Sequence, residues 1–435
     1  MNVKDIYGLF QKTKGIVTDT RLCVENSFFV ALKGINFDGN NFAKEAIKKG
    51  AKYALVNRKS ISKDSDRFIY VDDTLKTLQK LANYHRSIVK TKIIAITGSN
   101  GKTTTKELLN EILSKEYKIF ATRGNLNNHI GVPLSILNID KESDYAIIEL
   151  GANHLGEITC LCEIAEPDFG LITNFGYAHI EGFGSFEGVI KGKSELYDYI
   201  MGKKGRIFIN TDDPIQEKWL KYNTISKYGK TSKADYKIDQ INKKGKPISI
   251  KIENLIIESQ LFGDYNYSNV GASVAISKFL GVSNQKIKKG IESYVPANNR
   301  SQIIIKKNNT IVLDAYNANP SSMIASINSF LKNNPKRSIA VLGDMLELGR
   351  YEEEGHMEII RLIENSSFEE IFFVGKLFYK FSKKLDNLGG KIHFFKKKIE
   401  AHSYIEKRRF ENKNILIKGS RKVQLESVTS FFNSF

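Results

Sequence analysis

Cysteine is scarce in this chain of 435 residues, which contains only Cys23, Cys160 and Cys162. Three thiols cannot build a disulfide framework, and Cys160 and Cys162 lack a second Cys or His pair at the spacing of a zinc finger. We therefore expect buried, reduced thiols and a reducing compartment, the cytoplasm.

Long apolar runs are also missing. No stretch approaches the roughly 18 consecutive apolar residues of a membrane-spanning helix, so we expect no membrane insertion. The first residues, MNVKDIYGLFQKTKG, are polar and charged where a signal peptide needs an apolar segment, which argues against export. The chain has no internal repeat and no low-complexity tract. Its length favours roughly two to four globular domains.

Acidic residues are outnumbered by basic ones, which gives a formal net charge of +18. Such a charge can indicate nucleic-acid binding. The lysines are nevertheless spread through the chain in short groups such as KKGK and FKKKIE, mixed with Asn, Ile and Glu. We favour a lysine-rich solvated surface over a polyanion groove and expect no nucleic-acid partner. An acidic substrate would suit either interpretation.

Short apolar runs alternate with helix-like segments, which predicts an α/β protein of three domains. Residues 1–90 contain the strand-like runs SFFVALKG, KYALVN and RFIYVDD. The last part of residues 1–90 has a helical pattern, with Leu75, Leu78, Ala82 and His85 on one face. We expect a small mixed α/β N-terminal domain here.

The two following blocks have the buried strands that are typical of parallel sheets. Residues 91–296 place KIIAIT, YAIIEL, FGLITN and GRIFIN between helical segments, with a polar, hairpin-like stretch near residues 230–260 and a last amphipathic helix that ends at Gly281. Residues 297–435 repeat the alternation with TIVLDAYN, SIAVLGD, EIFFVGK and NILIKGS. We expect a central P-loop mononucleotide-binding domain and a C-terminal Rossmann-like domain, with ligands at the carboxyl ends of the strands.

A shortened phosphate-binding loop follows the first strand of the central block. The segment AITGSNGKTTTKE has Ile96 where the usual motif has its first glycine. Its context is still strand, glycine turn and helix (residues 103–114), so backbone N–H groups surround the positive end of a helix. We expect Lys102 to contact the outer phosphates and the Thr103 hydroxyl to reach magnesium. The predicted phosphate-binding residues are Gly98, Ser99, Asn100, Gly101, Lys102, Thr103 and Thr104. The alternative is a helix N-terminus that carries Gly-Lys by chance.

Metal ligands for a bound triphosphate should lie at neighbouring strand ends. Glu149 closes the strand YAIIEL, His179 follows FGLITN, and Lys193 lies in GVIKGKSELY. Each of the three, taken alone, has an ordinary structural explanation. The sequence pattern therefore indicates candidates and does not establish a metal site.

Several motifs together resemble those of the Mur ligases, ATP-dependent enzymes that add amino acids to the peptidoglycan precursor. TGSNGKTTTKE resembles the short loop of that family, and VTDTR with FFVALKGINFDG resembles its substrate-binding N-terminal domain. RGNLNNHIGVPLSIL, IIELGANHLGEI, ITNFGYAHIEGFGSFEGVIKGKSELY and GDYNYSNVGASVAI resemble successive motifs of its central domain. DAYNANPSSM, VLGDMLELG and IKGSR resemble its C-terminal domain, and the resemblance covers nearly the whole chain.

The resemblance implies ATP and two magnesium ions as cofactors. Lys102 would hold the γ-phosphate, and Thr103 and Glu149 would bind one magnesium ion. Glu149, His179 and a carbamylated Lys193 would serve the second, since a carbamate turns a cation into the kind of oxygen ligand that magnesium prefers.

Other positions receive roles from the same resemblance. Lys193 is preferred to Lys191 because it stands four residues before Tyr197, which closes the motif. The nucleotide would also be approached by Asn266, Asn269, Arg300, Asp314, Tyr316 and Asn317. The UDP end of the substrate would be bound by Asp19, Thr20, Arg21, Lys33, Gly34, Asp38 and Gly39. One departure from the family pattern is the pair Lys422 and Val423, where smaller residues are expected.

The C-terminal motifs imply the family activity that joins D-alanyl-D-alanine to UDP-N-acetylmuramoyl-tripeptide through an acyl phosphate. The Asp-Asn-Pro-Arg motif typical of the preceding ligase, which adds the third amino acid, is absent. The third residue of the tripeptide, a diamino acid or lysine, stays open, and we expect a monomer. Two alternatives remain: another amide ligase of the superfamily, such as folylpolyglutamate synthetase, and a P-loop ATPase that acts on nucleic acid.

Overall fold

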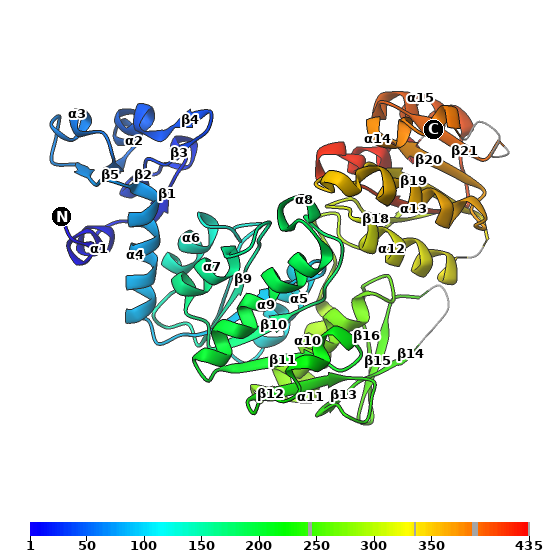
Figure 1. Ribbon diagram of the computed structural model, residues 1–435, viewed down its shortest axis with the longest axis horizontal. Helices are drawn as coiled ribbons and strands as arrows, with labels where there is room; N and C mark the ends of the chain where they lie inside the picture. Colours follow the sequence, from blue (N-terminus) through cyan, green and yellow to red (C-terminus); the bar gives the residue numbers. More distant parts are fainter. Residues whose placement is uncertain (242–245, 335, 385–389, 434–435) are drawn as a thin grey trace.

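Three main β-sheets organise the chain in the computed structural model, which describes residues 1–241, 246–334, 336–384 and 390–433. Figure 1 shows the first sheet at one end of the molecule, the second in the middle and the third at the other end. They fall within the three ranges that the sequence predicts. None of the helices in the described part of the chain combines the length and the apolar character that crossing a bilayer requires.

The N-terminal sheet has the order β1-β2-β5-β6, and all of its neighbouring strands are parallel. The elements of this part are α1 (Val3–Phe10), β1 (Ile16–Val17), η1 (Thr20–Leu22), β2 (Ser27–Val30), β3 (Lys33–Gly34), β4 (Phe37–Asp38), η2 (Gly39–Phe42), α2 (Ala43–Lys48), β5 (Ala51–Val56), α3 (Lys59–Ser62), β6 (Phe68–Tyr70) and α4 (Thr74–Ile88). Helix α4 begins after the capping side chain of Asp73. It buries Leu78, Ala82 and His85 as expected, whereas Leu75 is only partly buried.

The central sheet has seven parallel strands in the order β13-β12-β11-β10-β7-β9-β8. Its strands and helices are β7 (Lys92–Thr97), α5 (Lys102–Leu113), β8 (Ile119–Ala121), α6 (Gly131–Leu137), β9 (Tyr145–Glu149), α7 (Glu157–Ala165), β10 (Phe169–Ile172), α8 (Ile180–Phe183), α9 (Phe186–Gly202), β11 (Arg206–Asn210), η3 (Pro214–Trp219), β12 (Ile225–Gly229), β13 (Tyr236–Lys237), α10 (Asn266–Phe279) and α11 (Asn284–Ser293). The hairpin-like stretch forms an antiparallel sheet of β14 (Asp239–Ile241), β15 (Ser249–Ile252) and β16 (Leu255–Glu258).

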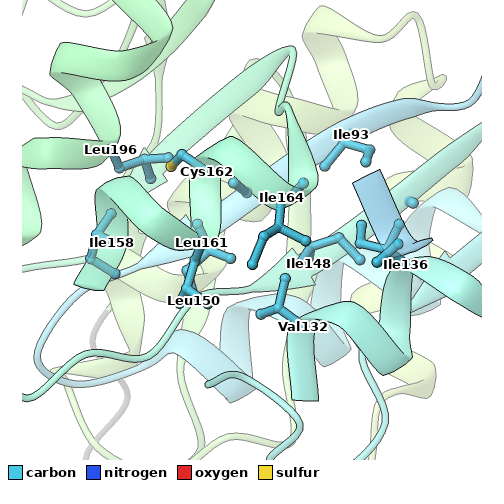
Figure 2. Close-up of a cluster of buried hydrophobic side chains, with 14 of the residues drawn as sticks. Ile93, Val132, Ile136, Ile148, Leu150, Ile158, Leu161, Cys162, Ile164 and Leu196 are labelled. Carbon is cyan, nitrogen blue, oxygen red and sulfur yellow. The ribbon is translucent and has the colours of Figure 1, made fainter. Parts of the chain in front are cut away.

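One face of the central sheet packs against α6, α7 and α9, as Figure 2 shows. Ile93 and Ile148 from the strands are fully buried there, which follows from strands that are apolar on both sides. Cys162 lies in this core, but Cys160 is exposed, so the expectation of a buried thiol is wrong for Cys160. The two residues are two positions apart on α7, and a period of 3.6 residues turns such positions to different faces.

The C-terminal sheet has six strands in the order β17-β18-β22-β19-β20-β21, with only the β17–β18 pair antiparallel. Its elements are β17 (Gln302–Lys306), β18 (Asn309–Asp314), α12 (Pro320–Asn333), β19 (Ser338–Gly343), η4 (Gly349–Tyr351), α13 (Glu352–Glu364), β20 (Glu370–Val374), α14 (Lys376–Tyr379), η5 (Ser382–Lys384), β21 (Ile392–Phe395), α15 (Lys398–Arg408), β22 (Asn414–Lys418), η6 (Arg421–Val423) and η7 (Leu425–Asn433). The unusual pair after Arg421 is accommodated easily, because Lys422 is exposed and Val423 packs against the C-terminal core.

Candidate active site

A cleft with a volume of about 750 Å³ lies where the central and C-terminal sheets approach each other. Its floor is the carboxyl end of β7, which is flanked by β9 on one side and β10 on the other. Strands β8 and β9 lie on one side of β7, and the next strand in the chain, β10, lies on the other side. Open α/β sheets bind ligands at the point where the strand order reverses in this way. The volume lies within the usual range for a ligand pocket.

The loop after β7 has the shape that the shortened motif predicts. Gly98 and Gly101 have φ angles of +139° and +82°, a region that side chains disfavour. The neighbouring strand end holds the loop: Thr173 Oγ1 donates to the Asn100 carbonyl (2.6 Å), and the Asn100 N–H donates to Asn174 Oδ1 (3.0 Å). These two hydrogen bonds tie the loop to the end of β10.

Lys102 begins helix α5 and folds back over this loop. Its Nζ donates to the Gly98 carbonyl at 2.7 Å. Burial lowers the pKa of Lys102, and the positive charge of Arg300 acts in the same direction while Glu149 opposes it. The lysine thus lies at the loop where the outer phosphates of a nucleotide would be bound.

Glu149 ends β9 beside the loop, and its position confirms that strand ends converge here. Thr103 Oγ1 donates to its Oε2 at 2.9 Å, and Asn127 Nδ2 donates to its Oε1 at 2.8 Å. The Glu149 N–H donates to Thr122 Oγ1, which fixes the backbone as well. A hydroxyl and a carboxylate in contact are ligands that suit magnesium. Asn127 was not among the predicted residues, although it lies in the quoted motif RGNLNNHIG.

The predicted second metal site is not assembled in the described residues. No group of three or more His, Cys, Asp or Glu side chains in that part of the chain could hold a metal ion. His179 lines the cleft, but its Nδ1 lies 2.5 Å from Glu347 Oε2 of the C-terminal domain. This hydrogen bond lowers the pKa of the Glu347 carboxyl.

Lys193 is fully buried outside the residues that line the cleft. Its Nζ donates to the Ala152 carbonyl at 2.8 Å and lies 4.9 Å from the ring centre of Phe183. Burial lowers the pKa of Lys193 strongly, and the charge of Lys102 adds to the effect. Glu195, on the same helix α9, accepts the N–H of Gly156.

The two asparagines of α10 line the cleft next to the loop. Asn269 Nδ2 donates to Asn266 Oδ1 at 2.8 Å, and its Oδ1 accepts from Thr105 Oγ1 at 3.3 Å. Asn266 Nδ2 in turn donates to Ser301 Oγ at 3.0 Å. The chain of amides therefore connects the helix after the phosphate loop with the first residues of the C-terminal domain.

The C-terminal domain adds charged groups to the opposite wall of the cleft. The Arg300 guanidinium lies 3.5 Å from the ring centre of Tyr316, and its buried Nε has no hydrogen-bond partner among the described residues. Lys418 Nζ donates to Asp314 Oδ2 at 2.6 Å and to the Asn317 carbonyl at 3.5 Å. Lys418, in the quoted segment NILIKGS, was missed because a single strand-end lysine carries no signal in the sequence.

Most of the predicted nucleotide and metal residues line this one cleft. The predicted residues that do so are Ser99, Asn100, Gly101, Lys102, Thr103, Thr104, Glu149, His179, Asn266, Asn269, Arg300, Asp314, Tyr316 and Asn317. Gly98 and Lys193 are not among the residues that line the cleft.

The predicted substrate residues of the N-terminal domain lie elsewhere, on the turn η1 and around the β3–β4 hairpin. Arg21 forms an ion pair with Asp19 and is largely exposed, and Asp38 pairs with Arg58 at 2.7 Å. Lys33 and Gly34 are exposed, whereas Thr20 and Gly39 are buried.

Comparison with known proteins extends these observations to the whole chain. Three family models match it in succession: "Mur ligase family, catalytic domain" over residues 12–86, "Mur ligase middle domain" over residues 96–277, and "Mur ligase, glutamate ligase domain" over residues 299–421. The UDP-N-acetylmuramoyl-tripeptide–D-alanyl-D-alanine ligase of Bacillus subtilis is 34% identical over 430 residues, which cover 95% of this chain and 92% of the relative. The chain belongs to the Mur ligase family.

Solved structures agree with this membership. A crystal structure of MurF from Acinetobacter baumannii has a TM-score of 0.87 at 31% identity and covers 99% of this chain and 98% of its own. The MurF ligase from Thermotoga maritima in complex with ADP has a TM-score of 0.83 at 29% identity, with 97% of each chain covered. The predicted family and the predicted α/β, three-domain fold are thereby confirmed.

Proposed function

We propose that this chain joins the amine of D-alanyl-D-alanine to the terminal carboxylate of UDP-N-acetylmuramoyl-tripeptide, with cleavage of ATP to ADP and phosphate. The chain is an ATP-dependent ligase of its family, and its relatives are named for this reaction. The observation that carries the proposal is the cleft between the central and C-terminal sheets, which combines a phosphate loop with cationic groups from both sides.

ATP would lie with its phosphates on the loop of residues 98–104 and against the C-terminal wall. The unpartnered Nε of Arg300 is a donor that an anion can satisfy, since buried donors are seldom left without a partner. Lys102 would move its Nζ from the Gly98 carbonyl to the γ-phosphate, because an anion attracts an ammonium group more strongly than a neutral carbonyl does.

The reaction then needs two displacements. A carboxylate oxygen of the tripeptide attacks the γ-phosphorus and ADP leaves, which gives an acyl phosphate. The D-alanyl-D-alanine nitrogen attacks the acyl carbon, the C–O bond to phosphate breaks, and the amine loses a proton. Lys102 stabilises charge on the transferred phosphoryl group in the first step.

Magnesium fits one of the two predicted positions well. Thr103 and Glu149 would hold the ion, because their oxygens are in contact and the Asn127 amide fixes the carboxylate. A bound magnesium ion would neutralise phosphate charge. For the second position, His179 is at the cleft, whereas Lys193 is bound to the Ala152 carbonyl.

The carbamate on Lys193 stays a hypothesis, which the comparisons do not support. Its physical basis is the lowered pKa of Lys193, because the neutral amine is the form that reacts with carbon dioxide. A carbamate would also require the Lys193 side chain to move: it would have to break its hydrogen bond to the Ala152 carbonyl and turn the carbamate oxygens toward the cleft.

The N-terminal domain would bind the uridine nucleotide, and the two later domains would bring ATP and the dipeptide together. The exposed Arg21 and Lys33 are cations that suit a diphosphate. The boundaries near residues 90 and 296, the magnesium ions, the monomeric state and the absence of a nucleic-acid partner belong to this proposal as well.

Phosphate release measured with all three substrates tests the proposal directly. We expect release that depends on both UDP-N-acetylmuramoyl-tripeptide and D-alanyl-D-alanine, and a product with the mass of the joined peptide. Tripeptides with lysine and with a diamino acid at position three should be compared. Release that depends on a folate and glutamate, or on DNA, would instead favour one of the two alternative functions.

A further inference from the structure

Arg300 enters the cleft from the segment between α11 and β17, which joins the central domain to the C-terminal sheet. Its buried Nε has no hydrogen-bond partner among the described residues. Burial lowers the pKa of Lys102, and the positive charge of Arg300 adds to this effect. The two cations therefore act on the same part of the cleft, beside the phosphate loop.

The backbone on both sides of this arginine is strained. Asn298, Asn299 and Ser301 have φ angles of +56°, +58° and +49°, in the left-handed region. Asparagine adopts this region more readily than most other residues, but serine has no such preference. Strained backbone of this kind persists only where the surroundings impose it. The segment therefore needs fixed contacts before and after the arginine.

The end of strand β18 and the turn after it supply these contacts. The Tyr316 N–H donates to the Asn299 carbonyl at 3.2 Å. On the other side of the arginine, the Ser301 N–H donates to Asp314 Oδ1 at 3.2 Å. Lys418 Nζ donates to the second carboxylate oxygen of Asp314 at 2.6 Å, so the acceptor is itself held in place. The backbone is thus fixed at both neighbours of the arginine.

The far end of the Arg300 side chain is held by an aromatic ring. The central carbon of the guanidinium lies over the Tyr316 ring, 3.5 Å from the ring centre. A cation at this distance is attracted by the negative face of the ring. Because this attraction uses the flat face of the guanidinium, the N–H groups in its plane stay available for an anion.

We propose that Tyr316 is a positioning residue for Arg300: its ring holds the guanidinium so that the free N–H groups bind the phosphates of ATP. An arginine side chain has many rotamers, and a side chain that is already ordered loses less entropy when a ligand binds. The strained backbone fixes the start of the side chain, and the ring fixes its end. The inference rests on the nucleotide part of the proposed function and not on the identity of the peptide substrates.

Displacement of a fluorescent ATP analogue from the full-length protein, at fixed magnesium, gives the Kd of ATP and of adenosine. Tyr316→Leu removes the ring and should weaken ATP binding about three- to tenfold, within the range of cation–π energies. Its affinity for adenosine should stay within about twofold of wild type, because adenosine has no phosphates. Tyr316→Phe keeps the ring and should bind ATP like the wild type.

The double variant Arg300→Ala with Tyr316→Leu separates positioning from direct contact. If the ring acts only through the arginine, its removal from Arg300→Ala should change the Kd of ATP by less than about twofold, because the two effects are then not additive. Stacking of the ring on the adenine would instead give additive losses and a lower affinity for adenosine.

Arg421→Ala is the matched control. The Arg421 guanidinium lies 5.5 Å from the same ring centre, but Arg421 is not among the described residues that line the cleft. This change should leave the Kd of ATP within about twofold of wild type. Tyr316 is only partly buried, so Tyr316→Leu should fold, which thermal unfolding checks, and Tyr316→Gln gives a second variant without the ring.

Four results would overturn the inference: unchanged ATP affinity in both ring-free variants, unchanged ATP affinity in Arg300→Ala, an equal loss of adenosine affinity, or additive losses in the double variant. Failure of the wild type to form the joined peptide would refute the proposed peptide substrates. It would leave the affinities for ATP and adenosine interpretable.

Discussion

Gly98→Ala should disable the phosphate loop, and the structure allows its cost to be worked out. The φ angle of +139° is one that an L side chain rarely adopts, which costs about 1–3 kcal/mol. A Cβ would also lie 2.0 Å from Thr173 Oγ1 and 3.0 Å from the Thr173 nitrogen. The hydroxyl would have to rotate away and give up its 2.6 Å hydrogen bond to the Asn100 carbonyl. That loss adds about 1 kcal/mol.

Together, the backbone strain and the lost hydrogen bond would destabilise the phosphate-binding conformation of the loop by about 2–4 kcal/mol. Since about 1.4 kcal/mol corresponds to a factor of ten in an equilibrium constant, nucleotide affinity should drop by roughly 30- to 1,000-fold. The assay is the Kd of a fluorescent ATP analogue at fixed magnesium, with the fold checked by circular dichroism.

Gly15→Ala is the matched control for backbone strain. Gly15 has a φ of +134°, but a Cβ there would meet no atom within 4 Å, and the residue lies in the N-terminal domain. Gly15→Ala should impose a similar backbone strain and leave the nucleotide affinity unchanged. The double variant Gly98→Ala with Thr173→Ala should bind ATP about as weakly as Gly98→Ala, because both lack the hydrogen bond from Thr173 to the Asn100 carbonyl. If Gly98→Ala bound ATP within about threefold of wild type, the loop would not hold the phosphates as described.

Substitutions at three further residues probe the cleft and its surroundings. Lys102→Ala should lower the ligation rate at least about a hundredfold with unchanged circular dichroism, and retention of a tenth of the activity would contradict its role. Arg300→Ala should weaken ATP binding by about tenfold, as expected for a lost charged hydrogen bond, and an unchanged Kd would mean that its free Nε is not a phosphate donor. Burial lowers the pKa of Lys193, so between that lowered value and the usual one the unfolded chain binds more protons and wild-type stability rises with pH. Lys193→Met should reduce this slope in urea unfolding, and the part that remains should include the contribution of Lys102, whose pKa burial also lowers. Native mass spectrometry should show a mass increase of one carbon dioxide if Lys193 is carbamylated, and this increase should disappear in Lys193→Met. Recovery of activity of Lys193→Ala on addition of acetate would also support the carbamate. An active enzyme with an unmodified Lys193 would rule it out.

Local features of the site could be predicted from the sequence because they depend on neighbouring residues. The loop of residues 98–104 is a strand, a glycine turn and a helix in direct succession, and α5 begins within one residue of the predicted start. Glu149 is the last residue of a buried strand, and the carboxyl ends of parallel strands share one edge of the sheet.

Contacts between distant segments could not be predicted in this way. Lys418 reaches Asp314 because β22 is inserted between β18 and β19, and an alternation of strands and helices does not give the order of strands in a sheet. The carbamate hypothesis placed Lys193 by its spacing from Tyr197, yet helix α9 turns the lysine toward the Ala152 carbonyl.

The segment that follows β10 connects the phosphate loop physically with the C-terminal domain. Asn174 holds the loop through Asn100, and three residues further on the Tyr177 N–H donates to Ser321 Oγ at 2.9 Å. Asn100 itself accepts a hydrogen bond from Asn319 at 2.8 Å. Separation of the domains must therefore break contacts of the loop to which the proposal assigns ATP. If bound ATP stabilises the loop in this conformation, it also stabilises the contact between the domains, and linkage then requires the contact to raise the affinity for ATP by the same factor.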